Sequence, residues 1–355
     1  MAMKNPNTTV TEFILLGFSQ NPKIQSILFF IFLTIYITTW LGNLTVIMTV
    51  IYTPHLHTPM YFLLANLALI DISDSTVTAL RTLWSLISHT NSISYDWCIT
   101  QIFFFHFIAG AVDFFLVMMA IDRYIAIYRP LQYLLIMNQS VCIGLVAGAW
   151  LGGFAHSIVQ ITLIAQLPFC GPNILNNFYC DVSQLIKLAC TDTYITELLM
   201  VSNGGLLLTL MFCILLVSYS VILVKIRTHV TEGKRKALST CAAQIIVICL
   251  NFVPAMFIYD RPFQVFQVDK VASVLYTLIT PMLNPMIFTL RNTEMKNTIR
   301  KLRDRLGEPD RVPLSEQNVG VGRSKTGCQA DVCVNDGEAA PYQFQGLTHH
   351  CLKVG

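Results

Sequence analysis

Seven long apolar segments, joined by short polar connections, leave this chain few ways to fold. A helix needs roughly 20 apolar residues to cross the hydrocarbon core of a bilayer, and every segment is that long. Only 12% of the residues are charged, against about 25% in an ordinary soluble domain. A soluble fold with seven such helices would have too little polar surface. We therefore predict an all-α, seven-transmembrane helix bundle with spans at 24–51, 60–80, 99–128, 141–167, 198–224, 237–259 and 271–290.

Basic residues gather in some connections and are sparse in the others. The segments 225–236 and 291–305 are rich in Lys and Arg, which the positive-inside rule assigns to the cytoplasm. We thus expect the N-terminus outside, the C-terminus in the cytoplasm and a multi-pass protein of the cell membrane. No cleaved signal peptide is apparent in the first 20 residues. Asn7, in an Asn-Thr-Thr triplet on the predicted outer side, is a candidate glycosylation site.

The same pattern divides the chain into four parts. Residues 1–23 are expected to form an extracellular N-terminus and 24–291 the seven-helix transmembrane domain. A short amphipathic cytoplasmic helix is expected at 292–305. The composition then becomes rich in Gly, Asp, Glu and Ser, so 306–355 is expected to be a disordered cytoplasmic tail.

Four cysteines, at 98, 170, 180 and 190, lie on the predicted outer side. An even number in an oxidising compartment suggests two disulfides, with three possible pairings. Unpaired buried thiols are the alternative. A zinc site is less favoured because the loop has neither a Cys-x-x-Cys pair nor a matching His pair.

Polar residues inside the apolar segments carry the functional signal, because ionisable groups at membrane depth are costly. Asp71, Asn43 and Asn284 can form a buried cluster around water or a cation, with a sodium ion near Asp71 as one possibility. A purely structural hydrogen-bond network is an equal alternative. At the end of the third span, the adjacent Asp122 and Arg123 can form an ion pair, although an Arg also snorkels to the interface in many membrane helices.

Several motifs occur in a fixed order along the chain. They are Leu-Gly-Asn at 41–43, Pro-Met-Tyr-Phe-Leu-Leu at 59–64, Met-Ala-Ile-Asp-Arg-Tyr-Ile-Ala-Ile at 119–127, Lys-Ala-Leu-Ser-Thr-Cys at 236–241 and Pro-Met-Leu-Asn-Pro-Met-Ile-Phe at 281–288. Together they resemble the odorant (olfactory) receptor family of rhodopsin-like G-protein-coupled receptors over about residues 11–301.

The chain departs from the family pattern at a few places. Ile121 and Phe288 each replace the usual Tyr, Tyr128 the usual Cys, and Gln244 a common His. Many members have an acid where this chain has Val112, and here the acid follows one place later, at Asp113. That shift rotates the carboxylate by about 100° on a helix and weakens the case for a sodium ion near Asp71.

The resemblance implies a set of working residues. It selects the disulfides Cys98–Cys180 and Cys170–Cys190. It also implies a coupling switch made of Asp122, Arg123, Tyr124, Tyr219, Lys236, Asn284 and Pro285.

A ligand site is expected in the outer halves of spans three, five, six and seven. Phe105, His106, Ala109 and Gly110 lie on one face of the third span at helical spacing. By position in the family, the same cavity is expected to include Asn203, Leu207, Phe252, Ala255, Tyr259 and Thr277. Such a lining suits a small, mostly hydrophobic molecule with one hydrogen-bonding group, and disfavours a charged amine unless Asp113 faces it. The alternative is that the aromatic residues only pack helices and that His106 only bonds between them.

The function implied is an odorant receptor that activates an olfactory-type stimulatory G protein and raises cyclic AMP. Its expected partners are an odorant, that heterotrimeric G protein and membrane lipid. A net charge of +3 gives no reason to expect nucleic acid. No metal, nucleophile or phosphate-loop motif suggests an enzyme or a cofactor. A transporter or channel is the main alternative, but no repeat relates the two halves.

Overall fold

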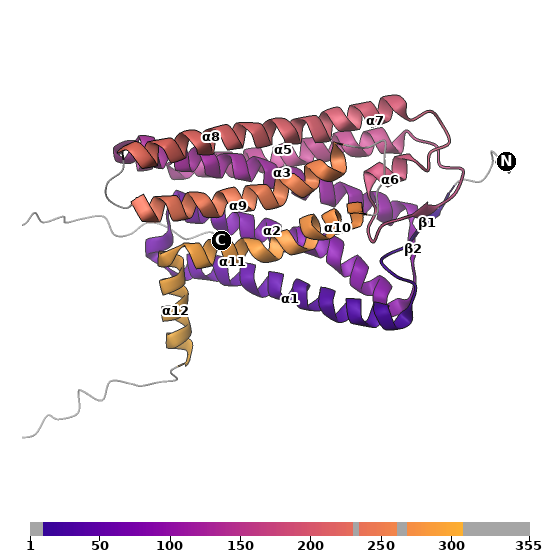
Figure 1. Cartoon of the computed structure of the whole chain (residues 1–355), viewed down its shortest axis with the longest axis horizontal. Coiled ribbons are helices and arrows are strands. Elements are labelled where there is room, and N and C mark those ends of the chain that lie inside the picture. The colour runs from indigo at the N-terminus through magenta and orange to yellow at the C-terminus, as the bar shows by residue number, and fades with distance from the viewer. Residues whose placement is uncertain (1–9, 230–233, 261–267, 308–355) are drawn as a thin grey trace, which may run out of the picture. The chain divides into compact units, whose positions relative to one another are not determined.

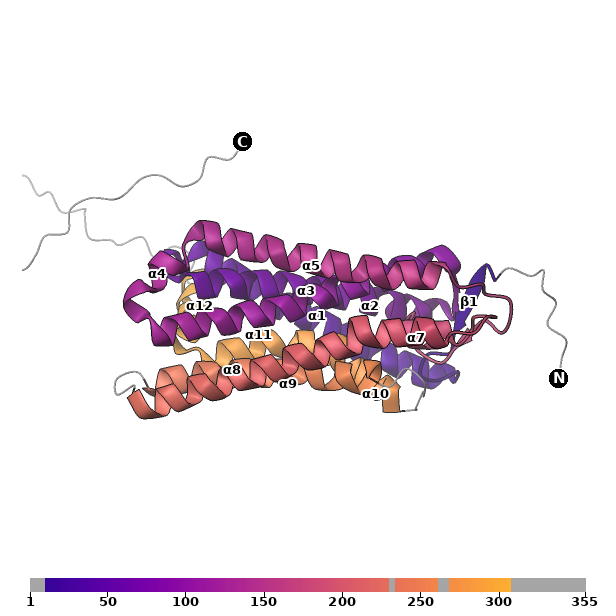
Figure 2. The same cartoon turned by 90° about the horizontal axis from the view of Figure 1, so that it is seen from above.

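The computed structural model describes residues 10–229, 234–260 and 268–307. Within them, seven helices are long and apolar enough to cross a membrane, which confirms the predicted fold class. Figures 1 and 2 show them side by side as a bundle. The spans are Pro22–Tyr52, Pro59–Ser88, Tyr95–Tyr128, Gln139–Ala165, Tyr194–Thr228, Ala237–Tyr259 and Val268–Thr289.

Two of these spans are built from several helical pieces. The fifth runs through α7 (Tyr194–Met200), the π-helical η3 (Val201–Leu206) and α8 (Leu207–His229). The seventh runs through α10 (Val268–Val274), the π-helical η4 (Leu275–Ile279) and α11 (Thr280–Arg291). The other long helices are α1 (Pro22–Tyr52), α2 (Pro59–Ser88), α3 (Tyr95–Tyr128), α5 (Gln139–Ala165) and α9 (Lys234–Tyr259).

Short elements connect the spans. They are η1 (Pro54–Leu56), η2 (Pro130–Gln132), α4 (Tyr133–Ile136), α6 (Val182–Ile186) and, after the seventh span, α12 (Thr293–Gly307). Asn7 and the tail from residue 308 lie outside the described residues, and so does the side chain of Lys236. Glycosylation, tail disorder and the role of Lys236 stay predictions.

Local sequence signals set where several helices begin. The side chain of Asn21 accepts a hydrogen bond from the backbone N–H of Lys23, and Ser94 and Asn138 do the same for α3 and α5. Proline at the first position of α1 and α2 has the backbone angle that a helix needs and lacks an N–H that would be unpaired there. The helix ends therefore follow capping residues as well as hydropathy.

The second span is longer than the sequence predicted. The expected span ended at residue 80, before Arg81, but α2 continues to Ser88. The Arg81 guanidinium donates a hydrogen bond to the carbonyl oxygen of Ser92, so the helix can carry this charge at its end. The helix stops where His89 takes a left-handed conformation, with φ of 52°.

Glycines bring α3 and α5 unusually close together. A Cβ placed on Gly153 would lie 2.4 Å from the carbonyl oxygen of Phe107 and 2.7 Å from the backbone nitrogen of Ala111. A Cβ on Gly110 would lie 3.0 Å from the Cα of Gly153. Small residues at a crossing let two membrane helices pack backbone to backbone, and here they set the distance between α3 and α5.

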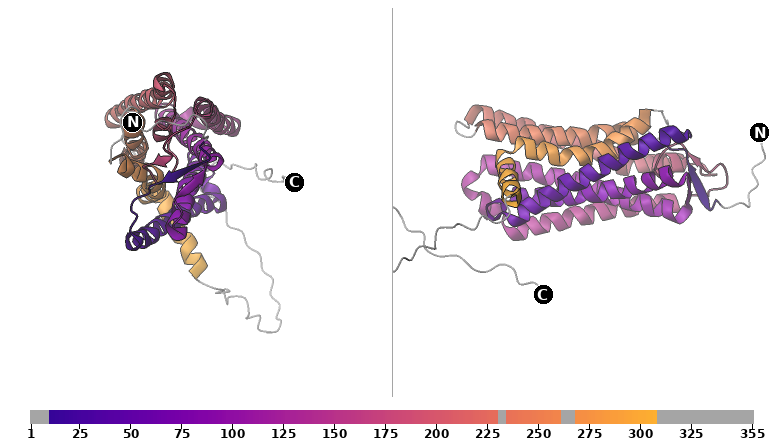
Figure 3. Two further views of the ribbon diagram at one scale, coloured as in Figure 1. Left: turned by 90° about the vertical axis from the view of Figure 1, so that its right-hand side faces the viewer. Right: turned by 90° about the horizontal axis from the view of Figure 1, so that it is seen from below.

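A small three-stranded sheet caps the end of the bundle at which α1 begins (Figure 3). The central strand, β1 (Glu12–Leu15), pairs antiparallel with β2 (Ser92–Ser94) and parallel with β3 (Ile174–Leu175). Phe13 and Leu15 are buried against apolar residues of α3 and of the segment between α5 and α7. The strand thus ties the N-terminal segment to two distant parts of the chain.

Two disulfides hold this cap in place. Cys98, in the first turn of α3, is bonded to Cys180, with Cα atoms 5.5 Å apart, which confirms the predicted pair. Cys170 is bonded to Cys190 and closes a loop between α5 and α7. The first bond anchors that loop over the end of α3.

Candidate functional site

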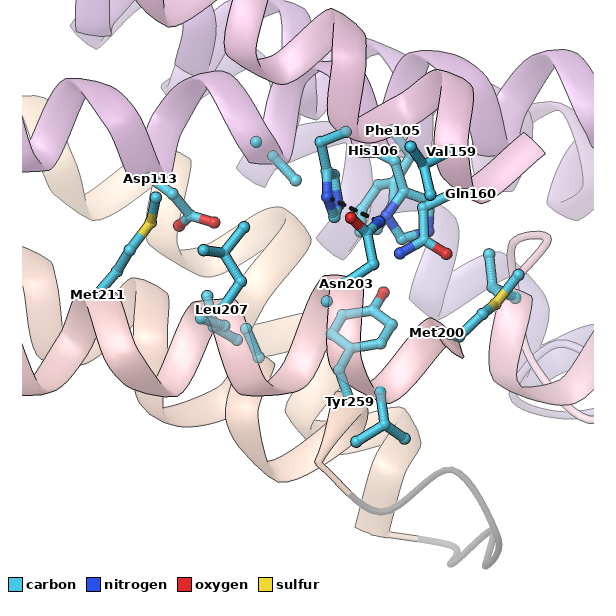
Figure 4. Close-up of a pocket in the computed structure, with 18 of the residues that line it drawn as sticks. Phe105, His106, Asp113, Val159, Gln160, Met200, Asn203, Leu207, Met211 and Tyr259 are labelled. Carbon is cyan, nitrogen blue, oxygen red and sulfur yellow. Dashed lines mark hydrogen bonds between the residues drawn. The ribbon is translucent and has the colours of Figure 1, made fainter. Parts of the chain in front are cut away.

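A cavity of about 240 Å³ lies between the helices, next to the disulfide-bonded loop that carries β3. Figure 4 shows side chains from several helices around it. Its walls come from α3, α5, η3, α8, α9 and η4, and α6 of the disulfide-bonded loop also contributes. Most of the lining is apolar. The volume is smaller than the roughly 300–1,000 Å³ of typical drug-sized sites, so it suits a small molecule.

The structure brings eight of the ten predicted ligand residues together around this cavity. They are Phe105, His106, Ala109, Gly110, Asn203, Leu207, Ala255 and Tyr259.

The other two predicted residues lie elsewhere. Phe252 is fully buried and stacks on Phe212, with ring centroids 5.7 Å apart. Thr277 is also fully buried, and its hydroxyl donates to the carbonyl oxygen of Ser273 at 2.9 Å. Neither lines the cavity, so their direct contact with a ligand stays a prediction.

Most of the polar side chains that line the cavity lie at one end of it. Asn203 and His156 are hydrogen-bonded through Nδ2 and Nδ1, 3.3 Å apart. The ring of His106 lies 5.6 Å from that of His156 and 5.9 Å from that of Tyr259, between centroids. Four side chains from four spans thus form one polar cluster, which can exchange hydrogen bonds with a ligand.

The contribution of α5 was missed by the sequence argument. His156 and Gln160 both line the cavity, and within the described residues Gln160 Oε1 is buried without a hydrogen-bond partner. The fourth span contains no Asp, Glu, Lys or Arg, so its charges give no sign of a role in the site. Two polar residues four positions apart in an otherwise apolar span share one helix face, and this signal was available in the sequence.

The loop between α5 and α7 forms a roof at the same end. Val182, Ser183 and Ile186 line the cavity. Just before them, Asp181 accepts hydrogen bonds from the hydroxyls of Ser183 and of Tyr259, the latter at 3.4 Å. Burial raises the pKa of the Asp181 carboxyl. Because Cys180 is bonded to Cys98, this polar contact joins the end of α9 to a fixed loop.

The far end of α3 carries an ion pair. Arg123 donates to Asp122 Oδ2 through Nε at 2.9 Å and through Nη2 at 2.5 Å. The hydroxyl of Tyr133, in α4, donates to the other oxygen of Asp122 at 2.6 Å. Burial raises the pKa of the Tyr133 phenol, so the phenol keeps its proton and can donate. The Asp122 carboxylate is thereby bonded on both oxygens.

The other predicted switch residues lie near the ion pair or deeper in the bundle. Tyr124 is exposed and stacks on Tyr128, with ring centroids 4.4 Å apart. Tyr219 is buried and donates to Gln244 Oε1 at 2.9 Å. Pro285 packs against α1, where a Cβ on Gly42 would lie 3.1 Å from its Cγ.

A buried polar network occupies the middle of the bundle. Asn284 Nδ2 donates to both oxygens of Asp71, at 2.9 and 3.2 Å, while Asn43 donates to the carbonyl oxygen of Pro281 at 3.0 Å. Within the described residues, Asp74 Oδ1 and Asn284 Oδ1 are buried without partners, and no group of three or more His, Cys, Asp or Glu could hold a metal. The hydrogen-bond network is present, and sodium binding near Asp71 stays a prediction.

Comparison with known proteins identifies the family. The family profile described as olfactory receptor matches residues 32–304. The chain is 56% identical to human Olfactory receptor 4D1 over 301 residues, which is 84% of this chain and 97% of that protein. It is 53% identical to human Olfactory receptor 4Q2, covering 84% and 95%, and 49% identical to mouse Olfactory receptor 4E2, covering 84% and 97%. The chain therefore belongs to the olfactory receptor family, whose members are non-enzymatic, multi-pass G-protein-coupled receptors.

Proposed function

We propose that this receptor binds a small, mostly hydrophobic odorant in the cavity between α3, α5, α8 and α9. In response it activates an olfactory-type stimulatory G protein and raises cyclic AMP. The observation that supports this most is the cavity itself, because five spans and a disulfide-anchored roof converge on one small, largely apolar space.

The lining favours a ligand with an apolar body and a hydrogen-bonding group. Its polar cluster contains donors and acceptors in Asn203, His156, His106 and Tyr259, while Leu207, Leu208 and Met211 supply apolar walls. The hydrocarbon part of a ligand is stabilised in such a space because its surface is removed from water. Its one polar group can form hydrogen bonds with the polar cluster in place of those that it loses to water.

The opposite end of α3 is proposed to face the cytoplasm and the G protein, with the N-terminus outside and Asn7 glycosylated. The basic residues near 225–236 and 291–305 support this orientation. At rest Asp122 accepts hydrogen bonds from Arg123 and from the hydroxyl of Tyr133, which together hold the ion pair in place. Activation is proposed to break it, so that Arg123 meets the G protein, while Tyr124, Tyr219, Lys236, Asn284 and Pro285 contribute to the switch.

The test begins with a screen of odorants in cells that carry the receptor and an olfactory-type stimulatory G protein. For an agonist, Tyr259→Phe and His106→Ala are each expected to raise the half-maximal concentration about fivefold, because each loses a hydrogen bond worth about 1 kcal/mol. Tyr52→Phe is the matched control, since Tyr52 is exposed and does not line the cavity.

Coupling is tested separately. Arg123→Ala is expected to reach the surface and to raise no cyclic AMP with the same agonist. Unchanged dose–response curves for both cavity variants would place the ligand elsewhere. Full signalling by Arg123→Ala at normal surface level would remove this residue from the proposed switch.

A further inference from the structure

Asp113 lines the cavity, and its carboxylate has no bonding partner in the part of the chain that the structure describes. It lies two helical turns along α3 from His106, and within the described residues no hydrogen bond or ion pair reaches its carboxylate. Figure 4 shows the carboxylate directed into the space beside Leu207 and Met211. The carboxylate therefore faces the region that a ligand would fill.

The described residues around the cavity offer this carboxylate no Lys or Arg. The two histidines lie with Asn203 and Tyr259 at the other polar end. An ionised acid in an apolar, membrane-embedded site is costly unless it is paired, and a cation bound in the cavity can supply the partner that the lining residues do not.

The walls suit an organic cation. Phe105, Phe114 and Tyr276 bring three aromatic rings to the lining. A cation is attracted to the face of an aromatic ring, most strongly where water is excluded. A protonated amine can thus bond to the carboxylate while the carbon atoms next to its nitrogen contact aromatic and thioether surface.

The two polar ends also define the length of the ligand. From His106 to Asp113 the helix advances by seven residues, or about 10 Å. A small molecule with a nitrogen at one end and an apolar body can reach from the acid towards the His106–His156–Asn203 cluster. A second polar group on it would meet that cluster.

We propose that the ligands of this receptor include small primary or secondary amines, bound as ammonium ions to Asp113 with their apolar body along α3 and α8. This inference rests on the proposed function and narrows its ligand class. It reverses the sequence-based expectation that an amine is disfavoured, since that expectation required Asp113 to face away from the other cavity residues.

The test compares amines with alcohols of the same carbon skeleton. The probes are hexylamine and hexanol, phenethylamine and phenethyl alcohol, and cyclohexylmethylamine and cyclohexylmethanol. Their dissociation constants are measured by thermal stabilisation of the purified full-length chain, for the unchanged protein and for Asp113→Asn and Asp113→Glu. Asp96→Asn is the matched control, because Asp96 is an exposed acid of the same helix that does not line the cavity.

At least one amine is expected to bind more tightly than its alcohol. Asp113→Asn should weaken that amine by about 30-fold or more, because an unpaired charge is then left in the site, and should change the alcohol by less than about threefold. Asp113→Glu should keep the preference for the amine, and Asp96→Asn should behave like the unchanged protein.

The inference is overturned if no amine stabilises the unchanged protein, if amine and alcohol bind equally, or if Asp113→Asn weakens both alike. It is also overturned if sodium ions stabilise the protein through Asp113 and amines do not. Should Asp113→Asn fail to fold, the amine–alcohol comparison on the unchanged protein and on Asp113→Glu decides.

Cyclic AMP in cells separates this inference from the proposed function. If alcohols bind and raise cyclic AMP while amines do neither, the proposed amine ligand class is refuted and the proposed receptor function stands. Amines that bind through Asp113 yet raise no cyclic AMP at normal surface level would leave the ligand class standing and refute the proposed signalling.

Discussion

Replacing Gly153 by alanine should separate α3 from α5. The added Cβ would lie 2.4 Å from the carbonyl oxygen of Phe107, whereas a carbon–oxygen contact needs about 3.3 Å. Both atoms it meets most closely belong to the backbone of α3, so no side-chain rotation can relieve the clash. The two helices must move apart locally by roughly 0.9 Å.

Separating the two helices by that distance lowers the stability of the fold. Opening a packed contact by 0.5–1 Å loses about a quarter to a half of its dispersion attraction, and overpacking a core typically costs about 1–3 kcal/mol. We expect a loss near 3 kcal/mol for Gly153→Ala, since only the backbone can yield. Because Gly110 packs on Gly153 and lines the cavity, the change should also weaken agonist binding.

The assay is the melting temperature of the purified receptor in detergent, together with surface expression. Gly148→Ala is the matched control, because it adds the same methyl group to α5 where nothing lies within 4 Å. Gly153→Ala should melt about 5 °C or more below the unchanged protein, while Gly148→Ala should match or exceed it. Equal melting temperatures for the two variants would refute the close approach of the helices.

Two further outcomes follow from the contacts described. Tyr133→Phe removes the hydrogen bond from the Tyr133 hydroxyl to Asp122. Because the resting state then loses about 1.5 kcal/mol of stabilisation, the ratio of active to inactive receptor should rise by up to about tenfold. Basal cyclic AMP should rise at equal surface level, and a basal level like that of Tyr52→Phe would contradict this. Cys98→Ser and Cys180→Ser should each abolish surface expression, since a bond that closes a loop of 82 residues contributes about 4.5 kcal/mol in the chain-entropy model. Normal surface levels and melting temperature for either variant would show that the bond is dispensable.

Hydropathy was enough to predict the spans, and the family resemblance then selected the pairing partner of Cys98. Long apolar runs identify membrane helices because the bilayer leaves the backbone few alternatives. Eight of the ten residues that the family pattern assigned to a ligand site line one cavity, and their contact with a ligand stays a prediction. The π-helical segments η3 and η4 were not predicted, since neither changes the hydropathy of its span.

The rotation of each span limits what its sequence predicts about the site. A helix that is apolar all round carries no periodic signal, so its rotation cannot be obtained from its sequence. Phe252 packs against Phe212 while Ala255, one turn away on α9, lines the cavity. Asp113 lines the cavity because the packing of α3 on α5 at their glycines sets which face of α3 points inward. The helix face of α5 that carries His156 and Gln160 is different, because the spacing of these two polar residues does indicate it.

The position of β1 has a consequence for how the chain is made. This strand is the centre of its sheet, yet Ile14 pairs with Ile174, which a ribosome adds 160 residues later. During synthesis the strand can first pair only with β2, through Phe13 and Ile93, and one of its edges stays open until the loop after α5 has emerged. Deleting residues 12–15 would leave both β2 and β3 without a partner, because neither pairs with the other. A tag placed before residue 10 leaves the pairing intact, whereas a truncation that reaches residue 15 removes the strand on which the later ones assemble.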